Sequence, residues 1–419
     1  MKKPELLAPA GSVEKAKIAF FYGADAVYAG TSKLSLRTRA DMDSDTLEET
    51  CRYAHSIGKK VYVALNIYAQ DEEYVEIEEE IKRLEQYGAD AIIASDVGVI
   101  EKIKEVAPNM EIHISTQANT VSLEAAKFWH RYGAKRVILA RELSKERISY
   151  IMKNKPKELE VEMFVHGAIC YAYSGRCYLS KYLANRCANQ GDCAQSCRWQ
   201  YHVYAQEVNN PDSIINIDYD EKGTYLFSSK DMCLIQQIPT IIEMGMDSLK
   251  IEGRLKTDYY LATVIRTYRQ AIDDYIELKE NHQEASYDAS KYIEELLKVK
   301  TRGMSEFYFS DDKNQDIHDL DGMSDNLAYE YGAKVIEKEE KLGNDIYVVE
   351  IKNKLSIGDT LEILLPQELD THAFQITQLY DVKTNEKIDT INPGVKGQQV
   401  KIKIPNVFLQ PGVVIRRKK

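Results

Sequence analysis

The segment Tyr22-Gly23-Ala24-Asp25-Ala26-Val27-Tyr28 decides the fold, because the chain repeats its pattern of an aromatic residue, a glycine and an apolar run. Close copies stand at residues 87–93 and 132–138, and looser copies at residues 57–61 and 244–249. Each close copy follows an amphipathic stretch of helical character. We therefore interpret the glycine as the left-handed C-cap of a helix and the apolar run as the strand that follows it.

The repetition predicts parallel strands that are joined by helices. Eight stretches have the length and apolar character of strands, and they are residues 5–10, 26–30, 61–66, 91–96, 111–115, 136–140, 160–165 and 248–252. Eight parallel strands with following helices close most naturally into an α/β fold, the (β/α)₈ TIM-like barrel. An open doubly wound sheet is the alternative, but no Gly-x-Gly-x-x-Gly turn follows the first strand.

The C-terminal ends of barrel strands carry the chemistry of such a fold. Polar residues follow the candidate strands at Asn66, Asp96, Gln117, Asn119, Arg141, Glu142, His166, Lys250, Glu252 and Arg254. Any one of them alone is more often a turn former or a helix N-cap. Their convergence on one face of a barrel predicts a site. Lys250, Glu252 and Arg254 alternate along the last strand and its exit, and the planar fork of an arginine suits a carboxylate ligand.

Five of the seven cysteines lie between residues 165 and 199, and they are Cys170, Cys177, Cys187, Cys193 and Cys197. Around the first, second, fourth and fifth the spacing is Cys-x6-Cys, Cys-x15-Cys and Cys-x3-Cys, which differs from the paired Cys-x2-Cys of ordinary zinc modules. Neighbouring glycines and tyrosines indicate an aromatic-walled pocket for an iron–sulfur centre. Structural zinc and disulfides are the alternatives, and disulfides are disfavoured because no apolar signal segment opens the chain.

The two remaining cysteines, Cys51 and Cys233, stand alone in the sequence. Residues 224–233 are typical of a short strand that leads into the cap of a helix. Cys233 is therefore expected in the first turn of that helix, where the dipole lowers the pKa of a thiol and favours metal binding. It is a rival fourth ligand, whereas Cys51 and Cys187 are interpreted as small buried hydrophobes.

The pattern predicts a barrel domain over residues 1–300, with a cysteine-rich insertion at about 168–223 between strands seven and eight. Residues 301–328 are polar and are interpreted as a linker. From about residue 329 the alternation becomes β-type, which predicts a small C-terminal antiparallel β-barrel over 329–419. Its lysines and the basic residues 416–419 either contact RNA phosphates or form a charged edge that prevents strand pairing.

Composition excludes several classes of protein. A formal net charge of −11 argues against indiscriminate binding to polyanions, which needs clustered Lys and Arg. No apolar run approaches the roughly 20 residues of a membrane span, and the N-terminus carries no lipidation motif or polybasic anchor. We therefore expect a cytoplasmic protein without a membrane partner.

Several of these segments together resemble the family long labelled collagenase-like peptidases. The resemblance is carried by residues 6–11, 162–170, 173–180, 189–199 and 248–254, and it extends over nearly the whole chain. It implies a barrel with a [4Fe-4S] cluster on four cysteines, in a family whose members hydroxylate RNA uridine or cytidine, or a quinone precursor. The C-terminal β-domain is most similar to the branch that makes 5-hydroxyuridine at the tRNA wobble position and depends on prephenate.

The resemblance also implies which residues form the site. Cys170, Cys177 and Cys193 match the ligands shared by the family. The fourth ligand is either Cys197 or Cys233, and Cys197 is preferred because the tRNA branch retains it. Cys187 has no counterpart.

The resulting hypothesis is an iron–sulfur-dependent tRNA uridine hydroxylase, with tRNA and prephenate as partners and a paralogous sister subunit as an optional one. Candidate catalytic residues are His166, Glu252 and Lys250, and the candidates for holding prephenate are Arg254, Gln117, Asn119 and Asn66. A peptidase is the alternative, although the chain has neither His-Glu-x-x-His nor Gly-x-Ser-x-Gly. A non-catalytic RNA-binding scaffold braced by the cluster is the third hypothesis.

Overall fold

The computed structural model describes residues 2–31, 34–35, 42–207, 210–216, 227–310, 316–319, 328–339, 345–366, 368–370, 372–405 and 407–419. Its contacts divide the chain into two compact units. Unit 1 contains Met1–Val13, Asp25–Leu255 and Thr301–Ser324, and unit 2 contains Glu14–Ala24, Lys256–Lys300 and Asp325–Lys419. The predicted boundaries at residues 300 and 328 are boundaries between folding domains. Units defined by contacts do not test such boundaries, so both boundaries stay a prediction.

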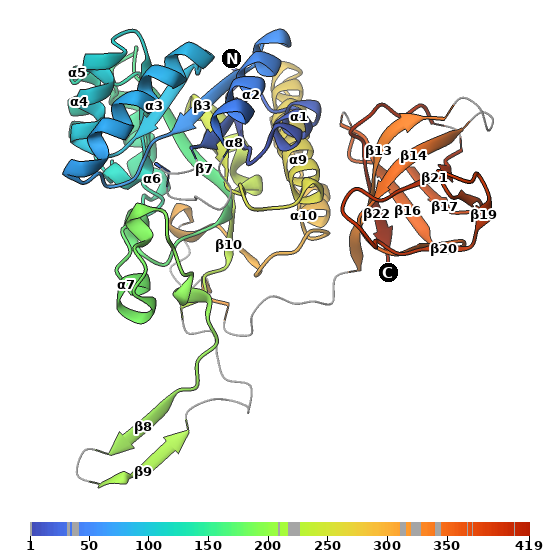
Figure 1. Cartoon of the computed structure of the whole chain (residues 1–419). Helices are drawn as coiled ribbons and strands as arrows, with labels where there is room; N and C mark the ends of the chain where they lie inside the picture. Colours follow the sequence, from blue (N-terminus) through green and yellow to red (C-terminus); the bar gives the residue numbers. More distant parts are fainter. Residues whose placement is uncertain are drawn as a thin grey trace. The chain divides into compact units, whose positions relative to one another are not determined.

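Unit 1 is built on a closed parallel barrel (Figure 1). Its strands are β1 (Glu5–Pro9), β2 (Ala26–Gly30), β3 (Lys60–Ala64), β4 (Ala91–Ala94), β5 (Glu111–Ile114), β6 (Arg136–Ile138), β7 (Glu160–Ala168) and β11 (Ser248–Ile251). The ring closes because β11 pairs in parallel with both β7 and β1. The predicted TIM-like barrel is confirmed, and each of its strands lies at the stretch that the repeated pattern indicated.

Helices alternate with these strands in unit 1. They are α2 (Ser44–Ser56), α3 (Tyr74–Tyr87), α4 (Val97–Val106), α5 (Leu123–Arg131), α6 (Lys145–Asn154) and α8 (Ile238–Glu243), with short 3₁₀ turns η2 (Asp71–Glu73), η3 (Thr116–Ala118) and η7 (Ile235–Gln237). Gly88 ends α3 at φ 77°, and Gly133 and Gly245 are also left-handed at φ 101° and 75°. The glycine C-caps are therefore confirmed. Asp96 is the N-cap of α4, because its carboxylate accepts hydrogen bonds from the amides of Gly98 and Val99.

The cysteine-rich insertion after β7 is irregular. It contains η4 (Tyr173–Gly175), α7 (Leu179–Ala184), η5 (Ala188–Gln190), η6 (Ser196–Arg198) and the hairpin of β8 (Tyr204–Glu207) and β9 (Asn210–Asn216). The described part follows β7 directly, as predicted, whereas residues 208–209 and 217–226 lie outside the described residues. The strand expected at 224–227 therefore lies mostly outside them.

The environment of Cys233 differs from the prediction. Residues Asp231–Cys233 form strand β10, which pairs antiparallel with the end of β7 and places Cys233 opposite His166. The helix starts later, at α8, where Pro239 occupies the first turn. The expected helix cap is wrong because the Asp231 carboxylate bonds to the buried Arg302 guanidinium instead.

Residues 301–310 contribute structure to unit 1. Met304–Ser305 form β12, which pairs in parallel with β10, and Phe307–Phe309 form the turn η9. Residues 311–315 and 320–327 of the predicted linker lie outside the described residues.

Unit 2 contains an antiparallel half-barrel and three α-helices among its described residues. The helices are α1 (Val13–Phe21, which starts in unit 1), α9 (Asp258–Glu280) and α10 (Ser290–Leu296), with the turn η8 (Glu284–Ser286). The strands are β13 (Tyr329–Lys338), β14 (Ile346–Ile351), β15 (Leu355–Ser356), β16 (Thr360–Leu364), β17 (His372–Gln375), β18 (Leu379–Tyr380), β19 (Lys387–Ile388), β20 (Thr390–Ile391), β21 (Gln399–Lys403) and β22 (Val414–Lys418). Eight of them form one sheet in the order β17-β16-β22-β13-β14-β21-β18-β19.

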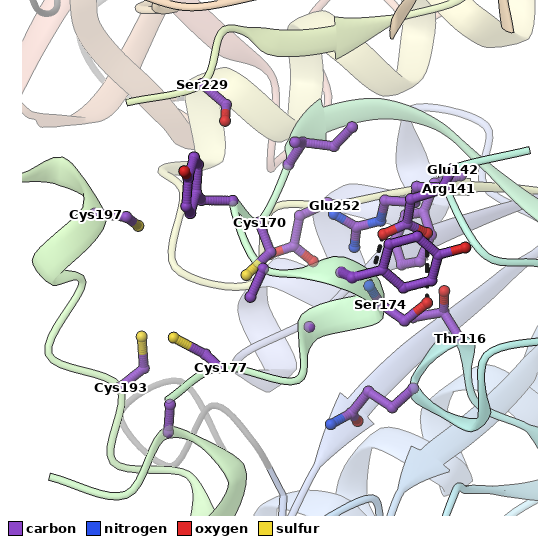
Figure 2. A pocket seen from close by; sticks show the side chains of 18 of the residues that line it. Thr116, Arg141, Glu142, Cys170, Ser174, Cys177, Cys193, Cys197, Ser229 and Glu252 are labelled. Atoms are coloured by element: carbon purple, nitrogen blue, oxygen red, sulfur yellow. Dashed lines mark hydrogen bonds between the residues drawn. The ribbon is translucent and has the colours of Figure 1, made fainter. Parts of the chain in front are cut away.

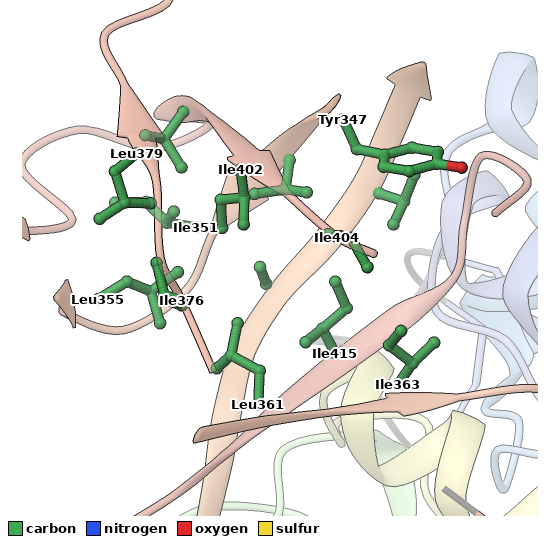
Figure 3. Close-up of a cluster of buried hydrophobic side chains, with 14 of the residues drawn as sticks. Tyr347, Ile351, Leu355, Leu361, Ile363, Ile376, Leu379, Ile402, Ile404 and Ile415 are labelled. Atoms are coloured by element: carbon green, nitrogen blue, oxygen red, sulfur yellow. The ribbon is translucent and has the colours of Figure 1, made fainter. Parts of the chain in front are cut away.

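The inward faces of these strands pack into an aliphatic core (Figure 3). Leu361, Ile363, Ile402 and Ile415 are each no more than 1% exposed. Burial of such side chains is worth about 1.5–3 kcal/mol each. The predicted antiparallel C-terminal domain is confirmed. None of the described helices, in either unit, is long and apolar enough to cross a membrane.

One of the basic residues at the C-terminus, Arg416, is buried and forms ion pairs within unit 2. Arg416 is fully buried and forms ion pairs with Glu295 and Glu362 at 2.6 Å each. Burial raises the pKa of Glu295, but Arg266 and Arg416 outweigh burial and lower it to about 2. Arg416 therefore stabilises unit 2 from within and is not accessible to an RNA phosphate, whereas both interpretations of residues 417–419 stay open.

Candidate functional site

A cavity of about 440 Å³ lies at the C-terminal ends of the barrel strands in unit 1. Its wall includes Ala64 and Ile138, which are the last residues of β3 and β6, and Gln117 just beyond β5. The insertion after β7 supplies a second part of the wall, and residues of the segment 307–318 supply a third. The site is therefore where a barrel of this type is expected to carry its chemistry.

Four of the seven cysteines line this cavity: Cys170, Cys177, Cys193 and Cys197. Figure 2 shows their sulfur atoms directed into one shared space. Cys187 lies on the same insertion but not in the cavity wall, and Cys51 and Cys233 are buried elsewhere. None of the seven cysteines, all of which are described in the structure, forms a disulfide bond. Of the two rivals for the fourth ligand position, the cavity thus contains Cys197 and not Cys233.

Local hydrogen bonds hold the cavity cysteines in an irregular backbone. The Asn189 side chain accepts from the amide of Cys177 and donates to its carbonyl oxygen, both at 3.2 Å. The Ser180 hydroxyl accepts from the amide of Ala194 at 3.2 Å and lies 3.9 Å from the sulfur of Cys193. The thiols are therefore positioned by the insertion itself, and Cys197 is the one that lies in a helical turn, η6.

The electrostatics of the four thiols favour a cationic centre between them. Burial raises the pKa of the Cys197 thiol and outweighs the opposite effect of Arg198. Negative charge on the other three cavity cysteines raises that pKa further. Thiolates that oppose one another's ionisation in this way are stabilised together by a bound metal centre.

The number and the kind of the donor groups suit an iron–sulfur cluster. Within the described part of the chain, no three His, Cys, Asp or Glu side chains converge closely enough to hold one metal ion. Structural zinc requires four ligands at about 2.3 Å from the metal. A [4Fe-4S] cluster bonds each thiolate to a different iron, so its ligands surround a wider space. Four thiols that line one cavity are the kind of donor set that such a cluster requires.

Two cations from β11 and its exit line the cavity. Lys250 is 3% exposed, and its ammonium donates to the Glu162 carboxylate at 2.8 Å and lies 4.3 Å from the centre of the Tyr28 ring. Burial lowers the pKa of Lys250, which Glu162 opposes. Arg254 is 5% exposed and donates to the hydroxyl of Ser35 at 3.2 Å. Buried cations at a cavity wall are suited to an anionic ligand.

The amide side chains of Asn66 and Gln117 form a pair in the cavity wall. The Asn66 amide donates to Oε1 of Gln117 at 2.8 Å, which fixes the orientation of the Gln117 side chain. Nε2 of Gln117 is buried and has no hydrogen-bond partner within the described structure. A buried donor without a partner costs about 1–3 kcal/mol, so this amide is suited to a ligand oxygen.

Glu252 is held at the cavity by two neighbours. Its carboxylate accepts a hydrogen bond from the Tyr28 hydroxyl at 3.0 Å, and its backbone amide donates to the carbonyl of His166 at 2.9 Å. Gly167 has φ 106°, and a Cβ there would lie 2.5 Å from the backbone oxygen of Glu252. Only glycine permits this close approach of β7 to the end of β11.

Three predicted site residues, His166, Asn119 and Cys233, are not among the residues of the cavity wall. His166 is 3% exposed on β7, and its catalytic role stays a prediction. Phe164, two residues earlier on β7, does line the cavity, and the pairing of β7 with β11 shifts register between these two residues. Asn119 is also outside the wall, but its side chain accepts from the hydroxyl of the cavity residue Ser174 at 3.0 Å.

The sequence interpretation missed parts of the wall. Tyr28 lies within β2, where a tyrosine is an ordinary strand residue, and its contacts with Glu252 and Lys250 identify it as part of the site. Phe307 and Tyr308 belong to a segment that was interpreted as a linker. The run of three aromatic residues at 307–309 could have indicated that this segment packs onto the folded domain and is not a linker.

Comparison with known proteins gives consistent results over nearly the whole chain. The family model "Peptidase family U32" matches residues 11–319, and "Peptidase family U32 C-terminal domain" matches residues 328–416. The chain is 38% identical to "tRNA hydroxylation protein P" of Escherichia coli, over 88% of this chain and 87% of that protein. It is also 38% identical to "tRNA hydroxylation protein P1" of Bacillus subtilis, over 92% and 89%. A relative from Porphyromonas gingivalis named "Collagenase" is 31% identical, over 96% and 94%.

Proposed function

Because this chain belongs to peptidase family U32, we propose that it hydroxylates the wobble uridine of tRNA at C5 in a prephenate-dependent and iron–sulfur-dependent reaction. The product is 5-hydroxyuridine. The observation that carries the proposal is the similarity to tRNA hydroxylation proteins over most of both chains. The cavity with four thiols, two buried cations and an unpartnered amide supports it independently of those names.

The four cavity cysteines are the residues that would hold the [4Fe-4S] cluster. When bound, such a cluster supplies one-electron transfer at the wall of the cavity. Tyr171 and Tyr173, which line the same wall, limit the access of water to that place. The cavity wall thus contains aromatic rings, from Tyr171 and Tyr173, as well as the charged side chains of Lys250 and Arg254.

The cations of the cavity bind the organic co-substrate in this proposal. Prephenate carries two carboxylates, and Arg254 and Lys250 are the charged donors that face them. Lys250 already donates to Glu162, but an ammonium has three protons and can serve a ligand as well. Nε2 of Gln117 donates to a further oxygen of the ligand, with Asn66 holding the amide in that orientation.

The target base enters the cavity as a flipped nucleotide, because C5 of a stacked uridine is inaccessible to an enzyme. Hydroxylation replaces the hydrogen at C5 by a hydroxyl group, which is a two-electron oxidation. Its oxygen atom and its oxidising equivalents come from a co-reactant, either dioxygen or the organic donor, and we assign Glu252 as the group that takes the proton released from C5. The Tyr28 hydroxyl holds the Glu252 carboxylate in place at 3.0 Å. The backbone carbonyl of His166 accepts a hydrogen bond from the Glu252 amide at 2.9 Å and so helps to hold Glu252 in place.

The test is nucleoside mass spectrometry. The chain is purified without oxygen and then incubated with prephenate and tRNA that lacks the modification, with air admitted in one arm and excluded in the other. We expect 5-hydroxyuridine at the wobble position in at least one arm, and none without prephenate. A chain that retains its metal centre and folds, yet makes no product in either arm even with its paralogous sister subunit added, contradicts the proposal.

The second candidate function is proteolysis. It is favoured by the family description and by the relative named "Collagenase". The same preparation is therefore incubated with denatured collagen. Cleavage that persists after the metal centre is removed, in a protein that makes no modified nucleoside, would assign the chain to this class.

A further inference from the structure

The outer surface of the cysteine-rich insertion is rich in exposed aromatic rings. Among its described residues, the exposed large apolar side chains outside the cavity wall are Tyr178, Tyr182, Leu183, Trp199 and Tyr204. Only one of them is aliphatic. Tyr178 and Tyr182 are the most exposed, at 74% and 78%. Rings that are this exposed add nothing to the core of unit 1, so their role lies in contact with another molecule.

The charge of the same segment is opposite to that of the chain as a whole. Residues 171–204 contain the cations Arg176, Lys181, Arg186 and Arg198 and a single carboxylate, Asp192. The whole chain carries a net charge of −11. A cationic segment with aromatic rings, in an otherwise acidic protein, is typical of a surface that binds single-stranded nucleic acid.

The position of α7 connects this surface with the cavity. Cys177 and Leu179 line the cavity, whereas Tyr178 between them is exposed to solvent. Tyr182 follows Tyr178 by four residues, so both rings project from one side of the helical turn. On its inner side, Ser180 is 1% exposed and bonds to the segment of Cys193. The two rings therefore stand at the rim of the cavity on a turn that is fixed from below.

We propose that Tyr178 and Tyr182 form a stacking platform for the unpaired RNA bases next to the nucleotide that enters the cavity. This inference rests on the proposed function and names the surface that would hold the anticodon loop. Every base has a π-face, so two exposed rings at the rim stack the bases that flank a flipped uridine without selecting a sequence. Lys181, which lies between them in the sequence and is exposed, contacts the phosphates.

The composition of the platform favours RNA over a protein partner. The centre of a protein interface is depleted in lysine, whereas the exposed Lys181 lies between the two tyrosines of this surface. A protein partner makes a different prediction, because substitutions here would then change the assembly state of the protein and leave its affinity for RNA unchanged.

The test measures the affinity of the metal-loaded full chain for an anticodon stem-loop RNA with an unmodified wobble uridine. The double variant Tyr178→Ala and Tyr182→Ala should raise the Kd at least about ten-fold, with an unchanged dependence on salt. The variant with tryptophan at both positions should restore binding, because it keeps the rings. Lys181→Ala should instead reduce the slope of log Kd against log salt by nearly one.

The matched control is Tyr150→Ala on α6, where the ring is 61% exposed on another element. It should leave the Kd unchanged. Equal affinity of the double alanine variant and the parent chain overturns the platform while the proposed function stands. A change of molecular mass in light scattering with unchanged RNA affinity also overturns it, in favour of a protein interface. A parent chain that binds no RNA overturns both.

Discussion

The two ends of the barrel in unit 1 differ in how their buried polar groups are paired. At the N-terminal ends of the strands, Arg136 donates to Glu5 at 2.6 Å, to Glu160 at 2.7 Å and to Glu162 at 3.0 Å. The Glu5 carboxylate also accepts from Tyr62 and Ser248. At the C-terminal ends, the thiols are unbonded to one another and the Gln117 amide lacks a partner. Charges that satisfy one another stabilise a fold, whereas polar groups left without partners are available to a ligand.

Lys250 belongs to both ends, since it lines the cavity and donates to Glu162. Variants that damage one end and spare the other therefore test the comparison. We call the N-terminal end of the barrel, with its network around Arg136, the closed end. Variants at the cavity should lower the rate of the reaction with little change in the free energy of unfolding. Variants at the closed end should lower the free energy of unfolding with less effect on the rate.

The largest effect is expected for Cys197→Ser. A serine hydroxyl binds soft iron poorly, so the formation of 5-hydroxyuridine should fall by more than the roughly 100-fold that follows the loss of a partner supporting a metal ligand. The matched control is Cys187→Ser, which lies on the same insertion outside the cavity wall and should retain activity. Equal rates for the two variants would remove the distinction between cavity and bystander cysteines.

A large loss of stability is expected for Glu162→Ala at the closed end. The substitution leaves Arg136 and Lys250 buried without their shared carboxylate. Breaking a buried pair in this way costs about 3–5 kcal/mol, which a denaturant titration of the free energy of unfolding measures. Glu79→Ala removes a carboxylate that is paired with Arg83 at the surface, and it should cost less than about 1 kcal/mol. If both variants lost less than about 1 kcal/mol of unfolding free energy, the buried network around Arg136 would contribute no more to stability than a surface ion pair.

Acid should weaken the closed end in a predictable direction. Burial raises the pKa of Glu162, but Lys250 and Arg136 outweigh it and hold that pKa below the ordinary value of 4.5. The contribution of Glu162 is therefore fully present above about pH 4.5 and is lost as the pH falls through its folded-state pKa. The free energy of unfolding of Glu162→Gln should change less over that acid range than that of the parent chain. Parallel curves for the two proteins would contradict the ion network.

A smaller effect is expected for Gly167→Ala, which tests the link between β7 and Glu252. The new Cβ would lie 2.5 Å from the Glu252 backbone oxygen, and the residue also has φ 106°. Overpacking alone costs about 1–3 kcal/mol, and the displacement of Glu252 should lower kcat. Gly58→Ala is the control, because Gly58 has φ 69° with nothing within 4 Å of the added Cβ. It should lose stability only through its backbone and keep kcat.

The features that depend on neighbouring residues in the chain were predictable from the sequence. The glycine C-caps recur before parallel strands, and for this reason the order and the approximate ends of all eight barrel strands followed from the chain alone. The position of the cysteines after β7 was also predictable, because the strand and the thiols are adjacent in sequence.

Pairings between distant residues were not predictable. Arg416 pairs with Glu295 across 121 positions, and no local signal separates it from the basic residues beside it. Strand β10 has three residues and exists through its pairing with β7, so its own sequence resembled a helix cap. The absence of His166 from the cavity wall was not predictable for a similar reason, because the register shift between β7 and β11 is a property of the strand pair and not of either sequence alone.

The central claim is that the four cavity cysteines hold an iron–sulfur cluster, and metal analysis of the anaerobically purified chain tests it most directly. Iron and acid-labile sulfide are measured per chain, together with zinc, in the parent protein and in Cys197→Ser. The [4Fe-4S] assignment predicts about four irons and four sulfides per parent chain and a marked loss in the variant. One zinc per chain without sulfide, or a metal-free parent chain that still makes 5-hydroxyuridine, would contradict the account.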